Sequence, residues 1–269
     1  MTIYSGGEGY LQQNRNERLS DYLKDLAPPA ARRMSRRIKA VLRQWKNRRL
    51  SPQEVFTRVY AEKMWGGGPE AFYSGPGSND AAARPYADFV LGFAAQHGIK
   101  RIVDLGCGDF RVGRLIVRDG IDITGVDVVQ PLIAENNRRF SSAAVRFQCL
   151  DITTDPLPDG DLCLIREVFQ HISNAQISAV LDKLHKYKHV LFTDVQPDDI
   201  SGYAVNRDKV HGDSSRLVHE SCLKLDKPPF NIRGVRLVFE ATPQYAPSYA
   251  PFGSGFKMRT YHWEPAPGE

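Results

Sequence analysis

The stretch Val103-Asp104-Leu105-Gly106-Cys107-Gly108-Asp109-Phe110-Arg111-Val112-Gly113 decides the fold class of this chain. Residues 102–105 are apolar apart from Asp104, a pattern typical of the end of a buried strand. Two glycines one residue apart then predict a tight turn, because glycine adopts positive φ and lets a ligand approach the backbone closely. Apolar residues at helical spacing resume at Arg111. A strand, a glycine turn and a helix N-terminus together predict a cradle for a small molecule in an open α/β sheet.

Short apolar segments alternate with amphipathic ones around this stretch. Strand–helix alternation of this kind predicts an α/β fold with a doubly wound, mostly parallel sheet. Two later strand-like runs, at 235–239 and 256–261, predict an antiparallel pair near the C-terminal end. The predicted helices lie near 85–97, 111–119, 130–140 and 174–187, and the predicted parallel strands lie near 100–105, 121–127, 144–150, 161–165 and 188–194.

The composition is that of an ordinary globular protein, with 269 residues of which 42% are hydrophobic and 25% charged. No apolar run approaches the roughly 18 residues that a membrane span needs. The first residues lack the pattern of a signal peptide, so we expect a cytoplasmic protein. The cysteines form no CxxC pair, so we expect them to be reduced and predict no metal site. They are Cys107, Cys149, Cys163 and Cys222.

The net charge of +5 comes from one segment of the chain. Nine basic residues and no acidic one lie between Ala30 and Gln53. Residues 30–50 predict a basic helix, and we expect its apolar stripe to face the protein's own core and its basic face to be solvated. Peripheral contact with an acidic membrane surface and contact with nucleic acid are the alternatives. The apolar stripe consists of Met34, Ile38, Val41, Leu42 and Trp45.

A second helix is predicted to start at Ser51-Pro52-Gln53-Glu54, which combines a serine cap, a proline in the first turn and a glutamate at the third position. These two helices lie before the alternating pattern begins. We therefore separate an N-terminal helical extension, residues 1–64, from a main domain, residues 65–269.

Two segments outside the alternating pattern are candidates for covering a bound ligand. Residues 65–79 combine many glycines with three aromatic residues. A loop that folds over a ligand explains both features, whereas a flexible connector explains only the glycines. Residues 195–232 are long for a connection between core strands, so we predict a substrate lid there. Its polar side chains match no pattern of metal ligands.

The glycine turn suits two classes of ligand. A dinucleotide-binding turn needs the pattern G-x-G-x-x-G, whose third glycine would stand at position 111. The chain has Arg111 there, and Gly113 comes two residues late. Asp127, at the end of the second predicted strand, suits the ribose hydroxyls of either class. The dinucleotide prediction is therefore weakened.

The residues 103–113 resemble the first motif of class I S-adenosylmethionine-dependent methyltransferases, and three later motifs follow in the order of that family. Residues 124–128 resemble the second-strand motif, and residues 147–152 resemble the third. Residues 161–172 resemble the fourth-strand motif at the catalytic face. The resemblance covers about residues 85–195. It implies a Rossmann-like methyltransferase sheet and S-adenosylmethionine as the cofactor.

The resemblance also implies which residues hold the cofactor. Asp104 would meet the ligand's ammonium group, Asp127 its ribose hydroxyls and Asp151 its adenine amine, all tasks for a carboxylate acceptor. Three aspartates at successive strand ends favour a shared ligand over three separate capping roles. The other implied contacts are the turn residues Gly106, Cys107 and Gly108, the apolar Val128 and Ile152 against the adenine, and Arg166 for the carboxylate of the cofactor.

Arg166, Glu167 and His171 follow the fourth predicted strand and are the candidate catalytic residues. Methyl transfer needs the nucleophile and the methyl group held in line, and a hydroxyl acceptor must also lose a proton. His171 is the preferred general base because an ordinary histidine pKa lies near the operating pH. A packed histidine is the alternative. Glu167, four residues earlier, would share a helical face with it, and Arg166 could instead bind an anionic substrate group.

A finer resemblance points to a bacterial methyltransferase branch associated with surface-polysaccharide and small-molecule O-methylation. It implies a small-molecule or glycan acceptor that is methylated at oxygen. An RNA or protein methyltransferase that uses the basic helix, and a non-catalytic cofactor-binding protein, are the alternatives. The resemblance rests on Trp65–Gly68, Gly75-x-Gly77-Ser78, Gly106–Phe110, Gln170-His171, Asn206-x-Asp208 and Pro228–Phe230.

Overall fold

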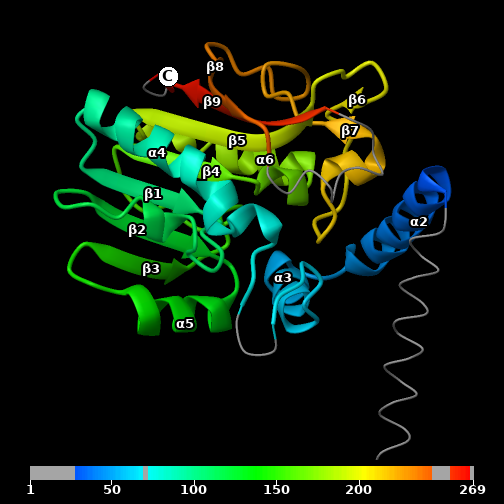
Figure 1. Ribbon diagram of the computed structural model, residues 1–269, viewed down its shortest axis with the longest axis horizontal. Coiled ribbons are helices and arrows are strands. Elements are labelled where there is room, and N and C mark those ends of the chain that lie inside the picture. The colour runs from blue at the N-terminus through cyan, green and yellow to red at the C-terminus, as the bar shows by residue number, and fades with distance from the viewer. Residues whose placement is uncertain (1–27, 69–71, 244–254, 267–269) are drawn as a thin grey trace, which may run out of the picture.

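The computed structural model describes residues 28–68, 72–243 and 255–266, and their core is one seven-stranded sheet. The strand order is β3-β2-β1-β4-β5-β9-β8 (Figure 1). The first five strands along the chain are parallel, and β9 pairs antiparallel with both β5 and β8. The predicted doubly wound sheet with its antiparallel pair is therefore confirmed. The strands are β1 (Arg101–Leu105), β2 (Asp122–Asp127), β3 (Val145–Cys149), β4 (Leu162–Arg166), β5 (His189–Pro197), β8 (Arg236–Ala241) and β9 (Phe256–Trp263).

The register of the central strands brings their carboxyl ends to one edge of the sheet. Leu105 at the end of β1 pairs with Val126 of β2 on one side and with Ile165 of β4 on the other. Asp127 and Arg166 each follow one residue later in their own strands. Residues that follow these strands are consequently held close together, at the place where open α/β sheets bind ligands.

Helices cover both faces of the sheet. Helix α4 (Asp80–Gln96) buries Tyr86 and Val90 in the apolar cluster on one face, where α5 (Gln130–Phe140) also packs. Helix α6 (Asn174–Leu181) buries its apolar side in the cluster on the other face. The helix predicted at 130–140 is confirmed. The helix predicted at 85–97 starts earlier, and the one predicted at 174–187 ends earlier and is followed by the 3-10 helix η4 (Leu184–Lys186).

The helix predicted at 111–119 is wrong, because the chain forms only the 3-10 helix η2 (Gly113–Leu115) there. Phe110 has a left-handed backbone with φ 58°, and its buried ring lies 4.7 Å from the ring of Phe147, edge to face. A Cβ atom on Gly113 would collide with the Phe110 ring. The burial of this aromatic ring therefore bends the backbone out of a helical path, and Gly113 leaves room for it.

Two helices precede the sheet, α2 (Pro29–Asn47) and α3 (Pro52–Ala61). The predicted capping box of α3 is confirmed, since Ser51 accepts from the Glu54 amide and Glu54 accepts from the Ser51 amide. Residues 1–27 of the predicted N-terminal extension lie outside the described residues. None of the described helices is long and apolar enough to cross a membrane.

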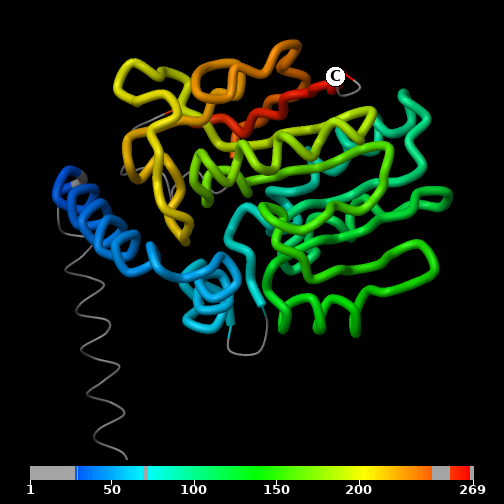
Figure 2. The backbone as a smooth tube through the Cα atoms, turned by 180° about the vertical axis from the view of Figure 1, so that it is seen from behind, coloured from blue at the N-terminus to red at the C-terminus, as the bar shows by residue number. Residues whose placement is uncertain are grey.

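The orientation predicted for α2 is wrong. Its polar side contacts the protein, through ion pairs from Arg37 to Glu220 at 2.7 Å and from Arg43 to Asp213 at 2.9 Å. The apolar stripe points to solvent, and its five side chains are between 53% and 70% exposed. The physical reason is that the segment facing α2 carries carboxylates and hydrogen-bonding groups rather than an apolar surface. Figure 2 shows α2 in blue beside this yellow segment.

The segment after β5 forms a small subdomain above the same edge of the sheet. It contains the parallel pair of β6 (Ala204–Val205) and β7 (Ser221–Cys222) and the 3-10 helix η5 (Arg216–His219). The buried guanidinium of Arg216 donates to the carbonyls of Ile172 at 2.9 Å and Arg207 at 2.6 Å. This side chain ties the subdomain to the turn after β4.

Candidate functional site

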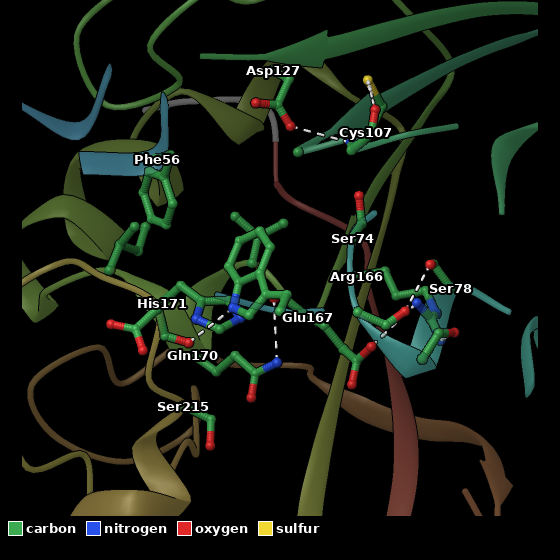
Figure 3. A pocket seen from close by; sticks show the side chains of 18 of the residues that line it. Phe56, Ser74, Ser78, Cys107, Asp127, Arg166, Glu167, Gln170, His171 and Ser215 are labelled. Carbon is green, nitrogen blue, oxygen red and sulfur yellow. Dashed lines mark hydrogen bonds and ion pairs between the residues drawn. The ribbon is translucent and has the colours of Figure 1, made fainter. Parts of the chain in front are cut away.

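A cavity of about 560 Å³ opens at the carboxyl edge of the sheet. Its floor comes from the ends of β1, β2, β3 and β4. Its walls come from α2 and α3, from the predicted lid, and from Trp65 and residues 74–78 of the predicted covering loop, which we name the aromatic loop. Figure 3 shows Asp127, Arg166, Glu167 and His171 around this cavity. The cavity brings together the predicted site residues Asp104, Gly106, Cys107, Gly108, Asp127, Val128, Asp151, Ile152, Arg166, Glu167 and His171.

The glycine turn forms part of the cavity wall with no side chain at its two tightest points. Gly106 has φ 77° and Gly108 has φ 55°, both in the left-handed region that favours glycine. A Cβ atom would collide with Val168 at the first position and with Ser74 at the second. The turn thus exposes its backbone to the cavity. A ligand that lies along the main chain requires such an exposed backbone.

Asp127 is held at the end of β2 by two backbone donors. Its carboxylate accepts from the amides of Gly108 and Val129, each at 3.1 Å. Burial raises the pKa of Asp127 to about 6, although these amides act in the opposite direction. Each carboxylate oxygen keeps a second lone pair for a further donor, so the group can still accept hydrogen bonds from ligand hydroxyls.

Asp104 and Asp151 line the cavity on either side of Asp127. Burial raises the pKa of Asp104 to about 7, Arg166 acts against this shift and Asp127 adds to it. Asp151 accepts from the Thr153 amide at 2.8 Å, which fixes its side chain in a local turn. The three strand ends predicted to hold a ligand therefore present three carboxylates to one cavity.

Arg166 and Glu167 form a polar pair at the end of β4. The Arg166 guanidinium lies 3.2 Å from the Glu167 carboxylate, and it donates to the Gly77 carbonyl at 2.9 Å. Glu167 has φ 56°, a strained value for a residue with a side chain. Strained backbone persists only where the surrounding structure holds it in place, and it is concentrated at functional sites.

His171 lies in the cavity wall, but its pKa is far from the ordinary value on which its prediction as a general base relied. Burial lowers the pKa of His171 to about 3, and the nearby Lys209 acts in the same direction. Its Nδ1 lies 3.1 Å from the Gly212 carbonyl, which only accepts, so Nδ1 carries the hydrogen. Its ring centre is 5.2 Å from that of Trp65. His171 is a weak base that joins the lid to the aromatic loop.

The sequence interpretation did not identify Ser74 as a site residue. Its hydroxyl accepts from the Asp109 amide at 2.8 Å, and its amide donates to the Asp109 carboxylate at 3.0 Å. Tyr60 of α3 shares a hydrogen bond with the same hydroxyl at 2.8 Å. These contacts fasten the aromatic loop to the glycine turn. The only signal in the sequence was the position of Ser74 in the glycine-rich stretch.

Basic and polar side chains form the outer rim of the cavity. Arg36, Lys39 and Arg43 of α2 line it from one side. The predicted lid contributes Asp213, Ser214 and other residues beside them, and Asp213 is the ion-pair partner of Arg43. The predicted covering loop and the predicted lid therefore both lie at the cavity.

Residues 102–190 match a family model described as a methyltransferase domain. The chain is 27% identical over 96 residues to uncharacterized methyltransferases of Mycobacterium bovis and Mycobacterium tuberculosis. The matched region is 35% of this chain and 49% of each relative, so the chain spans about half the length of the curated relatives it matches. These matches agree with the predicted methyltransferase domain over residues 102–190.

Solved structures with a similar arrangement include two methyltransferases. One is magnesium protoporphyrin IX methyltransferase from Synechocystis PCC 6803 with S-adenosylmethionine bound, at a TM-score of 0.47 and 12% identity, covering 80% of this chain and 98% of that one. The other is the N-methyltransferase NodS from Bradyrhizobium japonicum in complex with S-adenosylhomocysteine, at a TM-score of 0.45 and 13% identity, covering 68% and 88%.

Proposed function

We propose that this chain, whose residues 102–190 match a methyltransferase domain, uses S-adenosylmethionine to methylate an oxygen of a small-molecule or glycan acceptor. The observation that carries the proposal is the shape of the cavity. Strand ends, the aromatic loop, α2 and the lid all contribute to its wall. At about 560 Å³ it has the size of small-molecule and cofactor sites. Such a space suits a small acceptor or the end of a glycan chain.

The chain's own residues fit the cofactor. The cradle at Gly106 and Gly108 leaves room for a ligand along the backbone, and Asp104, Asp127 and Asp151 supply acceptors for an ammonium group, ribose hydroxyls and an adenine amine. When bound, S-adenosylmethionine supplies an electrophilic methyl group on a sulfonium. The apolar side chains beside the adenine-binding positions are those of Val128 and Ile152.

Glu167 is the general base that best fits the site. Its carboxylate lines the cavity on a strained backbone that fixes its position, and Arg166 orients it through the ion pair at 3.2 Å. His171 positions the lid and the loop, because an imidazole whose pKa is about 3 takes up a proton poorly near neutral pH. Removal of the acceptor's hydroxyl proton therefore falls to Glu167.

The basic rim supports an acceptor that carries negative charge. Arg36, Lys39 and Arg43 face the cavity from α2, and an anionic group of the acceptor would be attracted to them. The weaker resemblance to enzymes of surface-polysaccharide modification agrees with such an acceptor. RNA is the second candidate acceptor, favoured by the basic residues of α2, and it predicts affinity that falls steeply with salt.

The test combines cofactor binding with turnover. We expect calorimetry to detect S-adenosylmethionine binding and label from the cofactor to appear in anionic small molecules or glycans of a fractionated bacterial extract. Asp127→Ala should weaken cofactor binding, whereas Asp122→Ala, at the exposed opposite end of β2, should not. Absence of cofactor binding would overturn the proposal. Label found only in RNA or protein would show that the acceptor is a macromolecule of that class and not a small molecule or glycan.

A second pair of variants tests the base. Glu167→Gln should lower kcat by roughly 10²–10⁴-fold, the usual contribution of general acid–base catalysis, with little change in cofactor affinity. Glu62→Gln, on the exposed surface after α3, is the matched control. A Glu167→Gln enzyme with full turnover, or His171→Ala with the larger loss of kcat, would contradict the assignment.

A further inference from the structure

Helix α2 turns one side to the protein and the opposite side to solvent. Ala40 and Asn47 are buried, and the Asn47 amide donates to the His211 carbonyl at 3.0 Å. The other side of this 19-residue helix carries an apolar stripe that runs from Met34 to Trp45. Exposed apolar patches of this kind mark interaction sites in folded proteins. The stripe consists of Met34, Ile38, Val41, Leu42 and Trp45, and Trp45 is 70% exposed.

Positive charges flank this stripe. Lys39 and Lys46 are exposed and lie on the side of the helix next to the cavity, since each residue turns the helix by about 100°. No acidic residue lies between Ala30 and Gln53, whereas nine basic residues do. Long basic side chains beside an apolar stripe can extend their charged ends to anionic head groups while the stripe enters an apolar medium.

We propose that the apolar stripe of α2 inserts into the surface of an anionic lipid bilayer. The helix lies in the plane of the membrane, its apolar side chains enter the boundary of the acyl chains, and its basic side chains bind the lipid head groups. Trp45 suits this boundary, because its ring is apolar and its N–H is a hydrogen-bond donor. The proposal does not rest on the proposed function, since it concerns a face of α2 that points away from the cavity.

The charges favour a bilayer over two other occupants. A second copy of the chain would bring two basic helices together, with no acidic residue of α2 to pair with them. Nucleic acid would neutralise the basic side chains but would leave the apolar stripe in water. An anionic bilayer satisfies both features of the same helix.

Vesicle flotation tests the proposal with the full chain. We expect the protein to float with vesicles of phosphatidylcholine and phosphatidylglycerol, and to bind vesicles of phosphatidylcholine alone much more weakly. Leu42→Ser and Trp45→Ser should each weaken binding by roughly tenfold or more, because each removes one apolar side chain from the lipid. Ile200→Ser removes an exposed apolar side chain of the lid subdomain and is the matched control. Lys46→Glu should weaken binding to the anionic vesicles only.

Tryptophan fluorescence gives a second readout. Trp45 is the most exposed tryptophan, so the anionic vesicles should shift its emission to the blue, and Trp45→Phe should remove the shift while binding is largely kept. Binding that Leu42→Ser and Trp45→Ser leave intact would overturn the proposal. It would equally be overturned by a dimer in solution that these substitutions dissociate, or by salt-dependent RNA binding without vesicle binding.

Discussion

Asp104 and Asp127 share one property, a raised pKa that makes their carboxylates sensitive to a bound cation. Burial raises the pKa of Asp104 to about 7 and that of Asp127 to about 6. A carboxylate that is partly protonated near neutral pH must release its proton when a positively charged ligand binds beside it. The carboxylates of this site therefore hold more protons without a bound cation than with one.

We expect the affinity for S-adenosylmethionine to rise with pH. The folded, ligand-free protein holds a proton on Asp104 below a pKa of about 7, and an ammonium group binds only the ionised form. Affinity should therefore fall by up to ~tenfold for each pH unit below that value and level off above it. Calorimetry at pH 6, 7 and 8 in buffers of different ionisation enthalpy measures both the affinity and the protons released.

Asp104→Asn should weaken cofactor binding and flatten the pH dependence that remains. The exposed Asp122, on the neighbouring strand, gives the control variant Asp122→Asn. A wild-type affinity that is constant from pH 6 to 8 would contradict the prediction.

That the proposed cofactor residues line one cavity could be predicted from sequence, but the pKa of His171 could not. Asp104, Asp127 and Asp151 each lie within two residues of the end of a short strand, and parallel strands bring such ends to one edge. The pKa of His171 depends on burial by the lid and on Lys209, which is distant in sequence and comes from the lid itself. No local pattern contains that environment.

At the scale of elements, the glycine turn owes its shape to two separate constraints. Gly106 needs a left-handed backbone, with φ 77°, and it also needs space, because Val168 occupies the place of a Cβ atom. Gly120 has nearly the same backbone, with φ 79°, but nothing lies near the place of its Cβ. Substitution of Gly120 by alanine therefore introduces backbone strain alone, whereas the same substitution at Gly106 adds a steric collision.

Gly106→Ala should destabilise the protein more than Gly120→Ala. The second substitution carries only the cost of a left-handed alanine, about 1 kcal/mol. The first adds a collision with Val168, which should bring its total cost to about 2–4 kcal/mol. Urea unfolding of both variants measures the difference, and equal free energies of unfolding would show that the neighbouring side chain yields without cost.

The buried side chain of Arg216 is one of the contacts that attach the lid subdomain to the turn after β4. Arg216→Met should lower the free energy of unfolding by about 2–4 kcal/mol, because it leaves the carbonyls of Ile172 and Arg207 buried without their donor. The exposed Arg233 gives the control variant Arg233→Met, which should change stability little. Hydrogen exchange should show faster exchange in residues 207–222 of the first variant, and unchanged exchange there would contradict the role of Arg216.

Two elements could not be predicted correctly from local sequence. The helix expected at 111–119 fails because the Phe110 ring is buried against Phe147, which belongs to a strand more than thirty residues later. The side of α2 that faces the protein was also predicted wrongly. An apolar stripe normally faces a core, but the lid presents carboxylates and hydrogen-bonding groups to α2, among them Asp213, Glu220 and the His211 carbonyl.

At the scale of the whole molecule, the sheet was the most predictable part. Each parallel strand is a short apolar run bounded by glycine or polar residues, and that pattern needs no knowledge of distant contacts. The walls of the cavity were less predictable, because the extension, the aromatic loop and the lid meet only in the folded chain. The loop and the lid could be placed near the ligand from their length and composition, but the contacts of Ser74 and Arg216 that fix them could not.

The two opposite faces of α2 also set the height of the cavity mouth above the bilayer surface. Arg43 and Trp45 point in nearly opposite directions, because two residues turn the helix by about 200°. If Trp45 marks the level of the lipid head groups, then Arg43 and the mouth of the cavity stand above it by about the thickness of a helix, ~10 Å. The helix would act as a spacer. A membrane-anchored acceptor would have to project that far from the bilayer, so head groups with a sugar or phosphate extension would reach the cavity and short ones would not.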